Sequence, residues 1–300
     1  MVRPRGAYLG EGMINSNPND PRGIVWLASY PKSGNTWLRT FLYHLVRIQN
    51  GLPREEDELN KLDRASGYEA KLFGLFEQYL GKPLEQASRV EAMGVRPQVQ
   101  MTVAERMPNV AMLKTHNLMG ELGGMPTVSP RASIGAIYIV RDPRDVASSL
   151  AKHIGRSVDE AIEVMATSAF ATDNQAETAF EIWGSWSEHV ASWTTEKSPT
   201  ILVVRYEDML AKPTETFGAI AEHLRQELTP EQLTEAIELS SFDKLKRQEE
   251  EGAFRERSVH ADRFFVSGKA GGWRDWLTEA QALRILQTHR YEMGHFGYLD

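Results

Sequence analysis

The sequence predicts an α/β fold in which helices flank a central, mostly parallel sheet, giving three layers. Four short apolar runs have the composition of buried strands, namely Ile24–Ala28, Val110–Leu113, Ile134–Val140 and Ile201–Val204. Helical patterns separate these runs, and strands that alternate with helices are typical of a parallel sheet. A third observation is local: the first run leads through a short turn directly into an amphipathic helix.

Length and composition are those of a globular protein. The 300 residues suit one large α/β domain or two small ones, and contents of 41% apolar and 25% charged residues are ordinary. We expect a flexible arm at residues 1–22, because it is rich in Gly, Pro and Asn, and a single domain at 23–300.

Charge and hydropathy narrow the function classes. No cysteine is present, which excludes disulfides and thiolate catalysis, and the net charge of −7 argues against a general nucleic-acid binder. No apolar run approaches the roughly 20 residues that span a bilayer, and the first residues lack a signal-peptide core. A cytoplasmic protein is therefore expected.

Several helix ends are marked in the sequence. Three capping boxes are predicted: Ser157 with Glu160, Thr229 with Gln232, and Thr278 with Gln281. Pro230 and Pro213 fit the first position of their helices, and Gly294 is predicted to end the last helix. A stripe of Trp183, Trp186, Val190 and Trp193 at helical spacing is predicted to pack in the core rather than to form an acceptor site.

Two long segments fit the pattern of the sheet poorly. Residues 52–108 are mixed and interrupted, and residues 246–274 are first highly charged and then rich in Gly. Long irregular segments in compact domains are often lids or binding loops, so we expect an acceptor-side insertion and a closing loop. The acidic cluster Glu55–Glu58 is predicted to be solvated.

The turn after the first strand has the composition of an anion site. Pro31, Lys32, Ser33 and Gly34 form the turn, and the next helix is predicted to begin at Asn35. Backbone N–H groups and the positive dipole end of the helix face such a turn, and Lys32 adds a full charge. A Walker A loop places Lys after the last glycine, whereas Lys32 precedes Gly34. The sequence therefore predicts a different kind of phosphate or sulfate-ester site.

A second charged pair follows the second strand. Lys114 and His116 lie two residues apart at the end of the run, so their side chains share one side. Ligands bind beyond the carboxyl ends of strands in open parallel sheets. His116 is either a structural histidine or a base that takes a proton from a hydroxyl, since an unperturbed histidine has a pKa near 6.5.

The third strand also ends in charge and is followed by a helix. Arg141 can fork two N–H donors onto a phosphate, and Ser149 lies about two helical turns further on. Asp142, Arg144 and Asp145 are predicted to form ion pairs at the start of that helix.

These motifs together resemble the sulfotransferases that use 3′-phosphoadenosine-5′-phosphosulfate (PAPS), which have a P-loop-like fold. The order P-K-S-G-N-T-W at residues 31–37 is similar to the 5′-phosphosulfate loop, K-T-H at 114–116 to the catalytic strand, and Arg141 with Ser149 to the 3′-phosphate motif. The resemblance implies that Lys32, Ser33, Gly34, Asn35, Thr36 and Trp37 bind PAPS. It also implies His116 as the general base, with Lys32 and Lys114 as catalytic cations.

Motifs further along the chain extend the resemblance to Arg274. Tyr206 in the segment Y-E-D is similar to the adenosine-side strand, and Ser241-Phe242 to a short segment that lines the adenine. Gly268-Lys269 begins a G-x-x-G-x-W segment similar to the loop that closes over the cofactor. Many members carry Arg-Lys just before that first glycine, whereas this chain has Val266-Ser267. Arg141, with Lys269 or Arg263, is expected to compensate for the missing charge.

The resulting expectation is transfer of a sulfuryl group from PAPS to a hydroxyl or amine of a small-molecule acceptor. No metal is expected, because fixed cations supply the charge. Two alternatives are a kinase-like enzyme that uses Mg-ATP and a non-catalytic nucleotide-binding protein of the same fold. The sequence specifies neither the acceptor nor the oligomeric state, since loops without readable motifs set acceptor choice.

Overall fold

The computed structural model describes residues 3–4, 22–53, 55, 58–252, 254–257, 260, 263–265 and 268–299. The chain forms two compact units, each described here by itself. The first comprises residues 1–30, 67–138 and 167–203, and the second comprises 31–66, 139–166 and 204–300. Of the predicted arm at 1–22, only Arg3, Pro4 and Arg22 are described, and Val266 and Ser267 lie outside the described residues.

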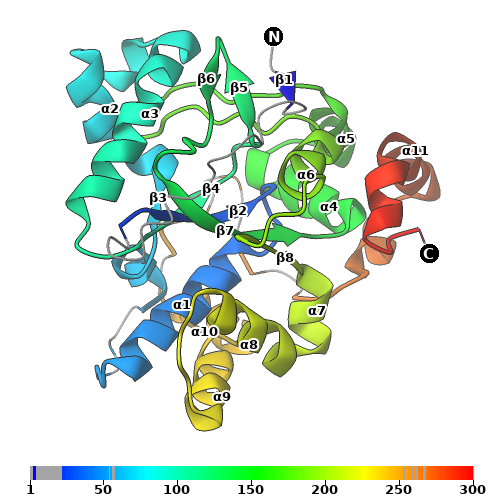
Figure 1. Cartoon of the computed structure of the whole chain (residues 1–300). Coiled ribbons are helices and arrows are strands. Elements are labelled where there is room, and N and C mark those ends of the chain that lie inside the picture. Colours follow the sequence, from blue (N-terminus) through cyan, green and yellow to red (C-terminus); the bar gives the residue numbers. More distant parts are fainter. Residues whose placement is uncertain are drawn as a thin grey trace. The chain divides into compact units, whose positions relative to one another are not determined.

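A five-stranded, mostly parallel sheet flanked by helices is the centre of the fold, which confirms the predicted fold class (Figure 1). The strands lie in the order β3-β4-β2-β7-β8. Their bounds are β2 Ile24–Ser29, β3 Gly67–Tyr68, β4 Ala111–Thr115, β7 Ser133–Val140 and β8 Ile201–Arg205. β2 and β4 are parallel, with Ile24 opposite Ala111 and Ala28 opposite Thr115, and β3 pairs with β4 in parallel as well.

All four predicted strands are present, with small shifts at their ends. The second begins at Ala111 rather than Val110, whose side chain is exposed, and continues to Thr115. The sequence did not indicate β3, because two residues are too few to show a period. This edge strand lies inside the segment 52–108, which therefore contributes to the sheet.

The first unit contains most of this sheet and a separate helical layer. Its other elements are β1 Arg3–Pro4, η2 Glu69–Lys71, α2 Phe73–Leu80, η3 Leu84–Gln86, α3 Arg89–Arg106, β5 Gly120–Leu122, β6 Met125–Pro126 and α6 Trp186–Thr194. α3 contacts both α2 and β2. Phe76, Met93 and Phe180 lie in its apolar core, where exclusion from water stabilises the unit.

The tryptophan stripe of the first unit is part of the core, as predicted. Trp183, Trp186, Val190 and Trp193 are all buried. The ring of Trp193 stacks on Tyr138 of β7, with ring centres 5.8 Å apart. These contacts attach α6 to the sheet, which leaves the stripe no surface for an acceptor.

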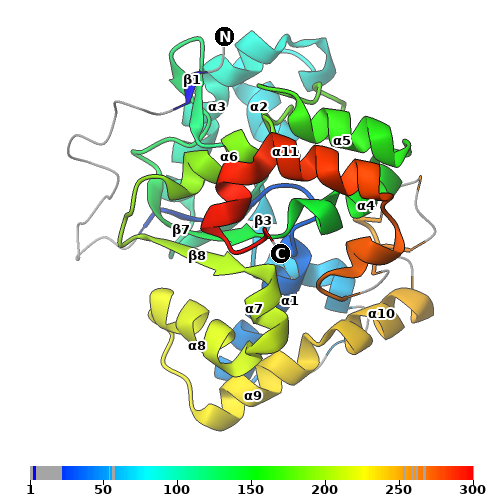
Figure 2. The ribbon, with the colours of Figure 1, turned by 90° about the vertical axis from the view of Figure 1, so that its right-hand side faces the viewer.

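The second unit is mainly helical. Its elements are α1 Asn35–Gln49, η1 Glu58–Arg64, α4 Pro143–Ile154, α5 Val158–Ala166, α7 Tyr206–Ala211, α8 Pro213–His223, α9 Pro230–Leu239, α10 Phe242–Glu251, η4 Gly272–Asp275 and α11 Glu279–His295. α9 packs against α1 and α8, while α11 lies across α4 and α5 (Figure 2). The rings of Phe41 and Phe217, 4.5 Å apart, join α1 to α8.

The helix starts agree closely with the local signals. Reciprocal capping hydrogen bonds form at Ser157, Thr229 and Thr278, and Pro213 and Pro230 occupy first-turn positions. The predicted end at Gly294 is wrong: α11 continues to His295, and Gly297 takes the left-handed conformation with φ of 70°. The Tyr298 N–H donates to the Met293 carbonyl five residues earlier, a local capping hydrogen bond that ends the helix just beyond Gly294.

The acidic cluster differs from the prediction at Glu58. This residue is buried, with its Oε2 3.9 Å from His44 Nε2. Glu55 forms ion pairs with Arg47, Lys61 and Arg64, while Glu56 and Asp57 lie outside the described residues. The cluster is therefore not simply solvated, because cations and a histidine pack against it. Among the described helices, none has the length and apolar character that crossing a membrane requires.

Candidate functional site

The turn at Pro31–Gly34, here called the Lys32 loop, has an unusual backbone. Lys32 has φ of 68° and Gly34 has φ of 106°, so both adopt the left-handed region. A non-glycine residue rarely takes that conformation, and such strain concentrates at functional sites. Gly34 is the N-cap of α1 and has no side chain with which to cap it. The start of α1 is therefore built as the sequence predicted, with backbone donors near a lysine.

Arg141 lies at the centre of the second unit's candidate site. One guanidinium nitrogen, Nη1, donates to the Lys32 carbonyl at 3.2 Å, and Nη2 donates to the Lys269 carbonyl at 3.4 Å. The guanidinium carbon lies 4.1 Å from the ring centre of Tyr206. Arg141 thus joins three segments that the sequence had assigned to the cofactor: the Lys32 loop, the start of α7 and the Gly268-Lys269 loop.

Aromatic side chains enclose the Lys32 loop within this unit. A Cβ at Gly34 would lie 2.6 Å from Cδ2 of Tyr206, so only glycine allows this approach. Trp37 packs edge-on against Tyr206, with ring centres 5.7 Å apart. The ammonium of Lys32 lies 3.7 Å from the ring centre of Phe264, which the sequence did not single out. Burial raises the pKa of Tyr206, although Arg141 partly opposes that shift.

The remaining predicted cofactor residues of this unit lie at helix starts and in the closing loop. Ser241 is the N-cap of α10, and the ring of Phe242 packs directly against Gly268, which has φ of 56°. Ser149 is half-buried in the second turn of α4. Lys269 is exposed, and Arg263 pairs with Glu250 at 3.1 Å. Of the two predicted substitutes for the missing cations, Arg263 forms an exposed ion pair and Lys269 lies in the loop whose carbonyl accepts from Arg141.

The acidic residues at the start of α4 were only partly predicted. Asp142 pairs with Arg144 at 2.8 Å, as expected. Asp145, however, accepts the backbone N–H groups of Gly271 at 2.8 Å and Trp273 at 2.7 Å. The two backbone hydrogen bonds add to the electrostatic interaction of this carboxyl with Arg141. They attach the glycine-rich loop to α4, and burial raises the pKa of the Asp145 carboxyl.

Buried donors in the second unit suit an anionic ligand. The Ser33 hydroxyl, Trp37 Nε1 and Arg141 Nε are buried and have no hydrogen-bond partner in the part of the chain that the structure describes. Buried polar groups are nearly always paired, so a group of unpaired donors near a lysine calls for a ligand that accepts hydrogen bonds. Phosphate oxygens meet that requirement, and the residues present therefore fit a nucleotide phosphate.

Lys114 and His116 lie in the first unit, at the carboxyl end of β4. The Lys114 ammonium is 4.2 Å from the ring centre of Tyr68, and the His116 ring is 6.0 Å from the same ring, edge to face. Both side chains contact one aromatic ring, so they share a side, as their two-residue spacing predicts. Both are at least nine-tenths buried.

The contacts of His116 define its tautomer. Its Nδ1 lies 2.8 Å from the Ser29 backbone carbonyl, which can only accept a hydrogen bond. In the neutral ring the proton is therefore on Nδ1, and the lone pair that can take a proton is on Nε2. His189 approaches the His116 carbonyl with its Nε2 at 3.1 Å, while burial lowers the pKa of His189 to about 3. His189 is therefore a neutral structural donor.

Sequence patterns gave no sign of Tyr68 or Glu181, which hold this pair of residues. Glu181 lies in the segment between α5 and α6, where no regular period exists. Its carboxylate accepts the His116 backbone N–H at 2.9 Å and the Tyr68 hydroxyl at 2.7 Å. One signal for Glu181 was present in the sequence. It stands in the mostly apolar stretch Ala179–Trp183, and burying a carboxylate without hydrogen-bond partners costs free energy, so a buried Glu181 needs donors around it.

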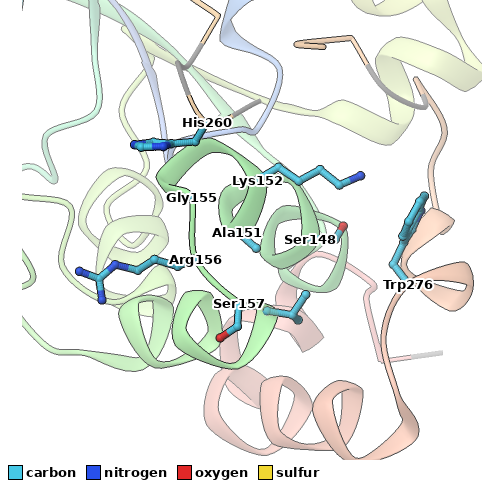
Figure 3. Close-up of a pocket in the computed structure, with 9 residues that line it drawn as sticks. Ser148, Ala151, Lys152, Gly155, Arg156, Ser157, His260 and Trp276 are labelled. Carbon is cyan, nitrogen blue, oxygen red and sulfur yellow. The ribbon is translucent and has the colours of Figure 1, made fainter. Parts of the chain in front are cut away.

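One hollow of the second unit lies away from the predicted phosphate contacts. This cavity of about 540 Å³ is lined by Ser148, Lys152, Arg156, His260 and Trp276, among others (Figure 3). The Lys152 ammonium lies 4.1 Å from the ring centre of Trp276. No predicted cofactor residue lines it. Within the described ranges no cluster of three or more His, Asp or Glu side chains suits a metal ion.

Known proteins resemble this chain along most of its length. Residues 22–297 match the profile of the sulfotransferase domain. A flavonol 3-sulfotransferase of Flaveria bidentis is 24% identical over 97% of this chain and 87% of its own length. Cytosolic sulfotransferase 16 of Arabidopsis thaliana is 25% identical over 93% and 78%, respectively. Among solved structures, retinol dehydratase in complex with androsterone and the inactive cofactor PAP has a TM-score of 0.61 at 23% identity, covering 92% of this chain and 82% of that one.

Proposed function

The chain belongs to the sulfotransferase domain family and is a sulfotransferase. From this premise we propose that it transfers the sulfuryl group of PAPS to a hydroxyl or amine of a small molecule and releases adenosine 3′,5′-bisphosphate (PAP). The observation that carries the proposal is the convergence of Lys32, Tyr206 and Lys269 on Arg141 in one unit, together with buried donors there that have no hydrogen-bond partner among the described residues.

The second unit supplies the nucleotide contacts in this proposal. The backbone N–H groups of Gly34, Asn35 and Thr36 and the Ser33 hydroxyl bind the 5′-phosphate, with the dipole of α1 adding to their field. Lys32 neutralises the oxygen that bridges phosphorus and sulfur. These groups stabilise negative charge that grows on the leaving phosphate, and they need no reorganisation to do so.

The other end of the nucleotide is assigned to four further segments. Arg141 and Ser149 bind the 3′-phosphate, and Lys269 contributes the charge that the family more often supplies at the position of Ser267. Tyr206 and Trp37 contact the adenine. Ser241, Phe242 and Gly268 complete its enclosure, since the Phe242 ring already packs on Gly268.

The first unit supplies the base. His116 Nε2 takes the proton of the acceptor hydroxyl as the acceptor oxygen forms its bond to sulfur. The bond from sulfur to the bridging oxygen breaks, and its electron pair remains on the phosphate that Lys32 neutralises. Lys114 interacts with the sulfuryl oxygens. By analogy with phosphoryl transfer, charge spreads over these oxygens in a loose transition state, so fixed cations suffice and we propose no metal.

The acceptor class and the organisation of the chain are further parts of the proposal. The structural neighbour was solved with androsterone, and a relative is named for a flavonol, so we propose a hydrophobic small molecule that carries a hydroxyl. We also propose one sulfotransferase domain at 23–300, with an acceptor-side insertion at 52–108 and a cofactor-closing loop at 246–274. The likeness to relatives named cytosolic supports a cytoplasmic location.

Calorimetric titration of the metal-free protein with PAP tests the proposal, with Mg-ATP as the control ligand. We expect micromolar binding of PAP without metal and no binding of ATP. A preference for Mg-ATP would support a kinase-like enzyme instead. Binding of PAP without turnover across phenols, aliphatic alcohols and amines would leave a non-catalytic nucleotide-binding protein, and absence of binding to either ligand would refute the site.

A further inference from the structure

The Glu181 carboxylate is buried in the first unit. Only 3% of the residue is exposed. Oε1 accepts the His116 backbone N–H at 2.9 Å, while Oε2 accepts the Tyr68 hydroxyl at 2.7 Å and lies 3.5 Å from Trp183 Nε1. All three donors are neutral. Because burial of a carboxylate costs free energy, packing alone does not account for a charge at this place.

The backbone around Glu181 is itself held firmly. The Glu181 N–H donates to Thr172 Oγ1 at 2.8 Å, and the next residue, Ile182, donates its N–H to Asn117 Oδ1 at 2.8 Å. The Leu118 N–H donates to the Ile182 carbonyl at 2.8 Å. This segment is therefore attached to the residues that follow β4. A carboxylate on so rigid a support can fix the position of another group.

Hydrogen bonds hold both the ring and the backbone of His116, and Glu181 provides a charged acceptor. The imidazole Nδ1–H of His116 donates to the Ser29 carbonyl, and its own carbonyl accepts from His189. Its backbone N–H donates to Glu181. A hydrogen bond to a charged acceptor is roughly twice as strong as a neutral one, so the contact with Glu181 is the strongest of these backbone and ring contacts.

The ring of Tyr68 connects Lys114 to the same Glu181 carboxylate. Tyr68 pairs with Lys114 in the parallel register of β3 and β4, and the Lys114 ammonium lies 4.2 Å from the centre of the Tyr68 ring. The hydroxyl at the far end of that ring donates to Glu181. Glu181 therefore fixes the ring on which the Lys114 ammonium rests.

We propose that Glu181 is a positioning residue that holds His116 and, through Tyr68, Lys114 in their mutual orientation for sulfuryl transfer. This inference rests on the proposed function, because it requires His116 to act as the base. Glu181 acts through these residues and has no assigned contact with PAPS or the acceptor. Misplacement of a reacting group by about 1 Å can cost about 10²-fold in rate, so the loss of this support should be measurable.

Hydrogen exchange of the His116 amide, followed by NMR, tests the contact without any acceptor. We expect Glu181→Ala to speed exchange at His116 at least 10-fold more than at Leu113, a control amide within β4. Glu181→Gln keeps an oxygen acceptor, so exchange at His116 should stay within about 3-fold of the native rate. Equal changes at His116 and Leu113 in Glu181→Ala would overturn the proposed support.

A double-mutant cycle tests the positioning role, with kcat measured for PAPS and 2-naphthol as the phenolic acceptor. We expect Glu181→Ala to lower kcat about 30-fold in the native protein but by a clearly smaller factor in the His116→Ala background, where only the support of Lys114 through Tyr68 is lost. Glu181→Gln should restore most of the loss. The affinity for PAP should stay unchanged in all variants. An equal loss in both backgrounds would refute positioning through His116.

The two experiments separate this inference from the proposed function. If His116→Ala turns over normally, the base assignment is wrong, and the positioning role that depends on it fails with it. If His116→Ala is impaired but Glu181→Ala is not, the base assignment stands and only the role of Glu181 fails. Should Glu181→Ala fold poorly, Tyr68→Phe keeps the test open, because it removes the hydroxyl that donates to the same carboxylate: an unaltered kcat in that variant would overturn the inference.

Discussion

At the scale of single residues, backbone conformation decides what the Lys32 loop can do. Lys32 and Gly34 both have positive φ, and the space beside Gly34 is filled by Tyr206. A positive φ brings successive N–H groups to one side, which is the arrangement that binds anions. The left-handed conformation is unfavourable for a lysine. The surrounding structure, rather than the local preference of Lys32, therefore determines the conformation of this loop.

Replacement of Gly34 by Ala should disrupt this loop. A Cβ would lie 2.6 Å from Tyr206, and φ of 106° is unfavourable for any other residue, so we expect a loss of about 2 kcal/mol in stability and at least a 10-fold weaker binding of PAP. Thermal unfolding and calorimetry measure the two effects. The matched control is Gly51→Ala, where φ is 61° but the space is open; it should cost about 1 kcal/mol and leave PAP binding unchanged. Native affinity in Gly34→Ala would argue against the loop as the phosphate site.

Replacement of His116 by Ala should impair turnover specifically. General base catalysis contributes roughly 10² to 10⁴, so kcat should fall at least about 10²-fold. PAP affinity should be unchanged, because the residues assigned to the nucleotide belong to the other unit. Steady-state kinetics and calorimetry check this, with His295→Ala, an exposed histidine of α11, as the control. Near-native kcat in His116→Ala would remove the residue from the role of base.

At the scale of elements, a helix start depends on neighbouring residues, whereas the contacts between a helix start and other segments join residues far apart in the sequence. The boxes at Thr229 and Thr278 use residues three apart, so each is visible in the sequence. The Asp145 carboxylate instead joins the first turn of α4 to Gly271 and Trp273, 126 and 128 residues later. That contact holds the start of η4 and the loop to which Lys269 belongs.

Replacement of Asp145 by Ala should release this connection. Two buried backbone N–H groups would lose their acceptor, and we expect the free energy of unfolding to fall by about 2 kcal/mol. The variant also no longer has to bury a carboxylate, and the raised pKa of Asp145 shows that this burial costs free energy. That gain offsets part of the loss. Urea denaturation measures the change. Asp159→Ala is the control: it removes an exposed ion pair with Arg284 and should cost less than about 1 kcal/mol. Equal losses in the two variants would mean that Asp145 does not anchor the loop.

At the scale of the whole molecule, each unit buries a neutral histidine. Burial lowers the pKa of His189 to about 3 in the first unit and that of His289 to about 4 in the second. In the unfolded chain each titrates near 6.5, so below that pH the unfolded state binds more protons than the folded state. The stability of both units should therefore fall as the pH drops from about 6.5 toward 4.

A comparison of the native protein with His289→Gln isolates this effect. At pH 5 the neutral buried histidine should cost the native protein about 2 kcal/mol relative to pH 7.5, and the variant should lack that loss. Buried carboxylates such as Glu69 and Glu207 have raised pKa values and change stability in the opposite direction, but they are common to both proteins. Chemical denaturation at the two pH values measures the difference, and parallel pH profiles would contradict the assignment.

Local and periodic features of the fold were predictable from the sequence. The four apolar runs, the caps and the buried tryptophans follow from residue patterns within about ten positions. The two-residue strand β3 was not, because its position depends on pairing with β4. The end of α11 was marked locally by Gly297, which the expectation for Gly294 overlooked. The Lys32 loop, Lys114 with His116, and Arg141 were all recognisable, since each follows a strand end.

The sequence by itself determined the family and the class of reaction, and it predicted the residues that carry charge to the candidate site. Motifs of consecutive residues preserve that information, because a strand, a turn and a helix start form locally. Only the tertiary structure decided which groups hold those residues in place: Arg141 contacts the Lys269 carbonyl 128 residues away, and Glu181 contacts the His116 amide 65 residues away. Such partners carry no signal in spacing, because packing of distant segments, rather than the pattern of neighbouring residues, brings a carboxylate to a backbone amide.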